Sequence, residues 1–164
     1  MRYWLVKYWL FLLALSLSAQ VHELCQACHS EAAGDVESHP HFKKNVSCDS
    51  CHGASEKHRL ANGGVAPDKI ATREQVPVLC GGCHVAQRQS YDTSRHAAVL
   101  VAGGKSAQCA TCHGNHALRP LAEMSARCQS CHTTLPAACS AKPVIATRVS
   151  CAGCHTPHAF AKLK

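Results

Sequence analysis

The chain has 164 residues, with thirteen cysteines and thirteen histidines but only eight Phe, Trp or Tyr residues, so its composition excludes an ordinary side-chain core. Its formal charge is +7, from 17 Lys and Arg against 10 Asp and Glu. The basic residues are scattered and form no run longer than Lys43-Lys44, so we find no nucleic-acid site. We expect something other than side chains to fill the interior.

The N-terminus is predicted to be a secretory signal over residues 1–19. Arg2 and Lys7 supply its positive charge, an apolar run follows at 8–17, and small residues suitable for cleavage come next. The run is shorter than a typical membrane-spanning helix, although an uncleaved anchor is the alternative. We therefore expect an exported mature chain, 20–164, that contacts a membrane only if the signal is retained.

Six Cys-x-x-Cys-His motifs follow along the mature chain. Three chemistries use cysteine pairs: disulfide frameworks, zinc knuckles and covalent haem attachment. Only haem attachment also requires the adjacent histidine, which is present all six times. The predicted attachment cysteines are Cys25, Cys28, Cys48, Cys51, Cys80, Cys83, Cys109, Cys112, Cys128, Cys131, Cys151 and Cys154, and the predicted proximal ligands are His29, His52, His84, His113, His132 and His155.

The motifs therefore predict six haem c groups, each with its iron, as the material that fills the interior. Seven other histidines are candidates for the distal axial positions, a supply close to the demand of six irons. They are His22, His39, His41, His58, His96, His116 and His158. His39 and His41 are expected to compete for one iron.

Sequence spacing restricts which iron some of these histidines can bind. His116 follows His113, and His158 follows His155, by only three residues. Each is too near its own motif to reach the opposite face of the same haem. We therefore expect each to bind the iron of a neighbouring haem, which would bring successive haems close together.

The motifs also fall into pairs, because the spacing within each successive pair is 23, 29 and 23 residues. We predict three dihaem units, approximately 20–60, 61–120 and 121–164. The third unit has no upstream histidine, and Cys139 stands near the place where one would be expected. Cys139 is either a small buried side chain, an iron ligand or a thiol that pairs between molecules.

Little regular secondary structure is expected. Short helices are predicted at 86–99 and at 120–132, the second opened by Pro120, with turns at 61–67 and 102–105 and no period-2 strand. The predicted fold class is mostly irregular with small α content, a haem-templated multihaem cytochrome c fold with short helices and little or no β-sheet.

The run 48–132 resembles the multihaem c-type cytochromes, through the segments "CDSCHGASEKH" and "YDTSRHAAV", and "CHTPH" extends the likeness beyond it. The similarity is greatest to periplasmic pentahaem donors to nitrite reductase and to decahaem conduits embedded in outer-membrane porins. This resemblance implies an electron wire in the periplasm, at the outer membrane or outside the cell. The implied partners are redox proteins: a membrane quinol dehydrogenase, a terminal reductase or a porin–cytochrome conduit.

Two other functions stay open at this stage. One is an enzyme, in which one haem lacks a protein ligand and reduces nitrite, hydroxylamine or a sulfur oxyanion. The third unit is the expected place of such a haem. The other is a subunit that polymerises into a haem filament. We prefer an electron carrier without catalytic residues, because two imidazoles on each iron leave no position for a substrate.

Overall fold

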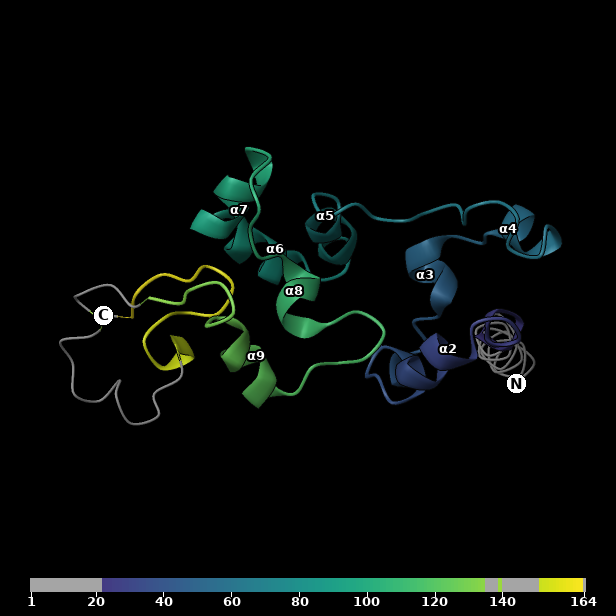
Figure 1. Cartoon of the computed structure of the whole chain (residues 1–164), viewed down its shortest axis with the longest axis horizontal. Helices are drawn as coiled ribbons and strands as arrows, with labels where there is room; N and C mark the ends of the chain where they lie inside the picture. The colour runs from purple at the N-terminus through teal and green to yellow at the C-terminus, as the bar shows by residue number, and fades with distance from the viewer. Residues whose placement is uncertain (1–21, 135–138, 140–150, 164) are drawn as a thin grey trace, which may run out of the picture. The chain divides into compact units, whose positions relative to one another are not determined.

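The structure is a computed structural model, and it describes residues 22–134, 139 and 151–163. Short helices joined by irregular segments make up this part of the chain (Figure 1). They are α2 (Ser30–Glu37), the 3-10 helix η1 (Phe42–Lys44), α3 (Cys48–His52), α4 (Glu56–Leu60), α5 (Val76–Gly81), α6 (Val85–Asp92), α7 (Arg95–Val101), α8 (Cys109–His113), α9 (Leu121–Arg127) and the 3-10 helix η2 (Cys151–Gly153).

The described residues form no β-sheet; an isolated antiparallel bridge joins His155 to Lys162. The predicted class of short helices with little or no sheet is therefore confirmed. Within the same residues, no helix has the length and apolar character needed to cross a membrane. The predicted signal, 1–19, lies outside the described residues.

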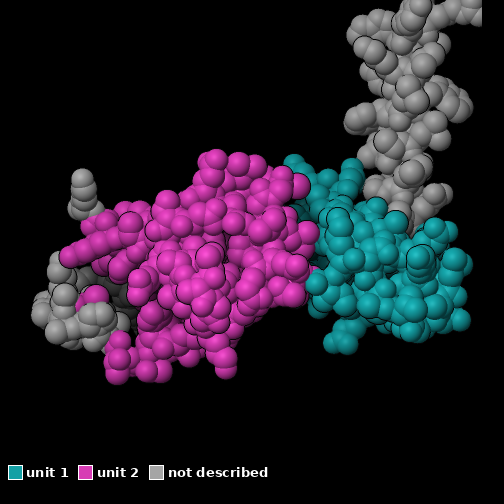
Figure 2. All heavy atoms as spheres, turned by 90° about the horizontal axis from the view of Figure 1, so that it is seen from above, with its two compact units in different colours: residues 1–70, 116–118 teal, residues 71–115, 119–164 magenta. Residues whose placement is uncertain are grey.

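Two compact units make up the chain (Figure 2). The first comprises Met1–Ile70 with His116–Leu118, and the second comprises Ala71–Asn115 with Arg119–Lys164. In the first unit α2 contacts η1, and in the second α5 contacts α6 and α8, α6 contacts α7, and α8 contacts α9. Each of these contacting elements, all within the described residues, is a helix of at most eight residues.

The helix predicted at 86–99 was wrong in one respect, because it is two helices. α6 ends at Asp92 and α7 begins at Arg95. Between them Ser94 has extended backbone angles (φ −82°, ψ 155°), and its Oγ accepts the N–H of Ala97 at 3.0 Å. A serine in this position caps a new helix rather than continuing the old one.

The helix predicted at 120–132 is shorter than expected. Pro120 does open it as α9, but it ends at Arg127. Beyond that point the main-chain bonds change from the i, i+4 to the i, i+3 pattern, as from Gln129 N–H to the carbonyl of Ala126. The predicted turns at 61–67 and 102–105 are present.

The side-chain core is very small. Tyr91, Ala97 and Leu100 form a buried cluster against which Phe160 packs. No side chain in the described part of the chain is completely buried, whereas Leu60, Val101 and Leu121 are each more than three-quarters exposed. Side chains alone therefore bury little apolar surface, as expected if another group supplies the interior.

Candidate haem-binding sites

Each Cys-x-x-Cys-His motif folds into a single helical turn. In four motifs the histidine N–H donates to the carbonyl of the first cysteine, from His29, His84, His132 and His155 at 2.9 to 3.0 Å. The other two motifs are the helices α3 and α8. Since side chains three and four residues apart share one face of a helix, each turn gathers both thiols and the imidazole on one side.

The first cysteines of consecutive motifs lie in contact. Cys25 is hydrogen-bonded to Cys48, Cys80 to Cys109, and Cys128 to Cys151. The hydrogen bond from Cys80, its largest cause, lowers the pKa of the Cys109 thiol to about 7. Burial, followed by the charge of Cys25, raises the pKa of the Cys48 thiol to about 11. The thiol contacts therefore pair the motifs in the same way as the motif spacing does.

Four motif histidines each face one of the lone histidines. The ring centroids are 5.9 Å apart for His29 and His58, 5.9 Å for His52 and His116, 5.9 Å for His113 and His158, and 6.0 Å for His132 and His96. Every pair joins one histidine from a motif to one from outside the motifs. A shared spacing of this kind indicates a common spacer between the rings.

That spacing differs from direct ring contact in the same molecule. The rings of His39 and His41, His22 and Phe42, and His96 and Phe160 touch with centroids 4.5 to 4.7 Å apart. By contrast, two imidazoles that bind one metal ion from opposite sides, through bonds of about 2 Å, have centroids roughly 6 Å apart. The four pairs therefore fit a haem iron between their rings.

Comparisons with known proteins agree with this geometry. Residues 13–53 match the family model "Cytochrome c554 and c-prime". The chain is also 31% identical, over 169 aligned residues, to the high-molecular-weight cytochrome c of Nitratidesulfovibrio vulgaris strain Hildenborough. That alignment covers 92% of this chain but only 28% of the relative's length. No solved structure matches.

The chain is a multihaem c-type cytochrome. Its haems are covalently attached, and cytochromes of this type are typically electron carriers that work outside the cytoplasm. Haem attachment, rather than zinc or a disulfide framework, is thus the use of paired cysteines that this family indicates.

Hydrogen bonds orient several imidazoles of the cytochrome. The Nδ1 atom of His52 lies 3.1 Å from the carbonyl oxygen of Lys69, that of His58 lies 2.6 Å from Val65, and that of His155 lies 3.0 Å from Phe160. A carbonyl can only accept, so each Nδ1 must carry the proton. The Nε2 lone pair is then available to bind iron, as in other metal-binding histidines.

Burial keeps other imidazoles neutral, which is the form that binds a metal. It lowers the pKa of His96, with a smaller effect from His132, and the pKa of His113, with smaller effects from His158 and His84. Burial and then His41 likewise lower the pKa of His39. Within the described residues, buried Nε2 of His22 has no hydrogen-bond partner, a cost that a bond from this atom to iron would remove, and buried Nδ1 of His96 has no partner either.

The remaining predicted ligands occupy different surroundings. His84 is the residue that precedes α6, and His39, His41 and His22 lie around η1. Cys139 is half-buried, and its role stays a prediction. Sequence reasoning did not find the carbonyls of Val65, Lys69 and Phe160, because a main-chain acceptor leaves no mark in the sequence.

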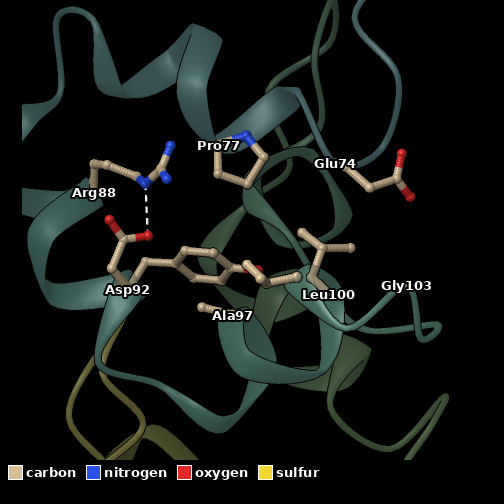
Figure 3. Close-up of a pocket in the computed structure, with 9 residues that line it drawn as sticks. Glu74, Pro77, Arg88, Asp92, Ala97, Leu100 and Gly103 are labelled. Atoms are coloured by element: carbon tan, nitrogen blue, oxygen red, sulfur yellow. Dashed lines mark hydrogen bonds and ion pairs between the residues drawn. The ribbon is translucent and has the colours of Figure 1, made fainter.

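A cavity of about 130 Å³ lies between α5, α6 and α7 (Figure 3). Pro77, Ala97 and Leu100 line it, and the ion pair of Arg88 with Asp92 (2.6 Å) stands at its side. Sites that enclose a cofactor usually measure roughly 300–1,000 Å³. This cavity is therefore too small to enclose a haem.

Proposed function

We propose that this cytochrome is an electron carrier that holds six haem c groups, mainly between pairs of histidines. The observation that carries the proposal is the set of four motif-to-lone histidine pairs, all with ring centroids 5.9 to 6.0 Å apart. Haem iron held by two imidazoles supplies one-electron transfer between its ferric and ferrous states.

The residues of the chain explain why transfer rather than catalysis is expected. The paired cysteines anchor each cofactor, and the carbonyls of Val65, Lys69 and Phe160 fix the orientation of ligand imidazoles. A second imidazole occupies the position that a substrate would need. Bis-histidine ligation also favours lower potentials than a histidine–methionine pair, which suits anaerobic respiration.

The contacts between first cysteines support grouping the haems in twos. They join the motifs at 25 and 48, at 80 and 109, and at 128 and 151. These twos correspond to the predicted dihaem units at approximately 20–60, 61–120 and 121–164. We therefore propose that the haems form three pairs, although the polypeptide itself folds into two compact units.

Location and partners follow from the class of protein rather than from a described surface. We propose a cytochrome of the periplasm, the outer membrane or the cell exterior. Its partners would be a membrane quinol dehydrogenase on one side and a terminal reductase or a porin–cytochrome conduit on the other. Since the curated relative is much longer than this chain, its partners are not transferred here.

A second candidate function is a reductase with one open iron at His155. Its support is that the histidine three residues further on, His158, faces His113 rather than His155. Nitrite, hydroxylamine or a sulfur oxyanion would be the substrate class of such an iron.

The two candidates are separated by the spin state of the ferric protein. The cytochrome is purified from a host that attaches haem, its haem content is obtained from intact mass and absorbance, and its EPR signals are integrated against that content. Six haems, all low-spin, are expected. A high-spin signal of about one iron in six would favour the reductase, and a colourless product without added mass would overturn both.

A further inference from the structure

We propose that His41, and not His39, is an iron ligand, and that His39 is a positioning residue that holds the main chain at His41. The proposal rests on the proposed function, because it assumes that lone histidines complete the coordination of the irons. Its evidence is a comparison between the segment after the first motif and the segment after the third.

Both segments follow the same course. The motif histidine, His29 or His84, directly precedes an eight-residue helix, α2 or α6, and its carbonyl accepts a hydrogen bond from the residue four positions on at 2.9 Å in each case. The residue after each helix, Ser38 or Thr93, donates its hydroxyl to the carbonyl three residues back. The two segments can therefore be compared position by position.

Position twelve after the motif histidine is a ligand position. In the third motif's segment it is His96, which faces the motif histidine His132 with a centroid distance of 6.0 Å. In the first motif's segment the same position is His41. The comparison assigns His41 the role of His96.

Position ten holds a buried side chain that accepts a main-chain N–H two or three residues further on. In the third motif's segment it is Ser94, 3% exposed, whose hydroxyl accepts the N–H of Ala97. In the first motif's segment it is His39, 7% exposed, whose Nδ1 accepts the N–H of His41 at 3.0 Å. The main-chain N–H of each donates to the carbonyl three residues back at 2.8 Å. Serine is not among the axial ligands of haem iron, so this position has a structural role.

The hydrogen bond that His39 accepts also excludes this residue as an iron ligand, on chemical grounds. A main-chain N–H can only donate, so Nδ1 of His39 must offer its lone pair. In a neutral imidazole the proton then sits on Nε2, which cannot bind iron. The polarity is the reverse of that at His52, His58 and His155, where Nδ1 faces a carbonyl oxygen and Nε2 keeps its lone pair.

Single variants of the haem-loaded chain test the assignment. His39→Ser introduces the residue of the corresponding position, His39→Asn keeps an acceptor, and His39→Ala removes it. His41→Ala removes the proposed ligand, and His41→Met replaces it with a weaker one. For each variant we would measure haem per chain, the high-spin fraction by EPR and the fraction of reduced haem that binds carbon monoxide.

His41→Ala is expected to turn about one sixth of the iron high-spin and to let the same fraction bind carbon monoxide. His39→Ser and His39→Asn should stay fully low-spin, so neither should show a high-spin fraction even if His39→Ala does. His41→Met should stay low-spin with the potential of one haem raised, since methionine ligation raises potentials. This variant decides the question if His41→Ala does not accumulate.

A high-spin sixth in His39→Ser and His39→Asn, or none in His41→Ala, would overturn the assignment. An unchanged set of potentials in His41→Met would do the same. The unmodified cytochrome, measured alongside, reports on the proposed function alone: fewer than six haems would count against that function, whatever the variants show.

Discussion

The backbone that follows the motifs differs between the first two motif pairs and the third. In the first two, one motif leads into an eight-residue helix, and the other ends as a helix followed by a glycine, Gly53 or Gly114, with φ of +74° or +80°. In the third pair Thr156 follows the last motif, and the chain turns instead at His158 (φ +66°) and Phe160 (φ +54°).

The difference shows that the same attachment motif can be followed by different backbone conformations. Glycine adopts a positive φ at little cost, whereas a residue with a side chain is strained there. In the third pair that strain falls on His158, which is itself a proposed ligand, and the hydrogen bonds between Thr156 and Ala161 hold the turn.

Removing the two cysteines of a motif should have the largest effect on the structure. The loss of helix should differ between the second and the third motif pair. Cys109→Ala/Cys112→Ala should abolish most of the helical circular dichroism, because α8 contacts both α5 and α9. Cys151→Ala/Cys154→Ala should lose about one sixth of the haem but keep the helices, since it alters only the 3-10 turn η2. Equal loss of helix in the two variants would contradict the comparison.

Removing a lone histidine three residues after a motif tests whether the second and third pairs use it alike. His116→Ala and His158→Ala should each make about one sixth of the iron high-spin, because each removes the ring facing His52 or His113. Asn115→Ala, beside His116, is the control and should stay low-spin. EPR integration would expose a difference between the pairs if only one variant responded.

Replacing the glycine that follows a motif, Gly53 or Gly114, should destabilise the protein less than removing a haem anchor or a ligand. Gly53→Ala and Gly114→Ala each place a side chain at φ +74° or +80° with ψ of 176° or −174°, a backbone conformation essentially restricted to glycine, at about 1–3 kcal/mol. Gly53→Ala should carry an added cost, because its Cβ would lie 2.9 Å from the Cβ of Asp68. Denaturant unfolding of the haem-loaded variants measures both, and a Gly53→Ala protein as stable as the unmodified one would refute the prediction.

The smallest expected effect is at the cap of α7. Ser94→Ala removes the acceptor of the Ala97 N–H and should reduce the free energy of unfolding by about 1 kcal/mol. Gln87→Ala, on the exposed side of α6, is the matched control and should change it little. Thermal unfolding compares the two, and equal stability would show that the cap contributes nothing.

Much of the local structure follows from the sequence. The motifs predicted their own helical turns, and Pro120 predicted the start of α9. The break at Ser94 was also readable, because serine before a helical run is a capping signal. The pairing of His158 with His113, and the choice between His39 and His41, were not readable, since both depend on where the chain returns and on the polarity of one hydrogen bond.

The small side-chain core described above bears on how such proteins diverge. Packing normally restricts substitution, because a change of one methylene in a close-packed interior costs stability. Among the described residues the buried apolar cluster is limited to Tyr91, Ala97 and Leu100, so packing of side chains against one another restricts few positions. Descendants of one ancestor can then differ almost everywhere except at thiols, imidazoles and turn residues, so kinship is better traced through the intervals between those residues than through overall identity.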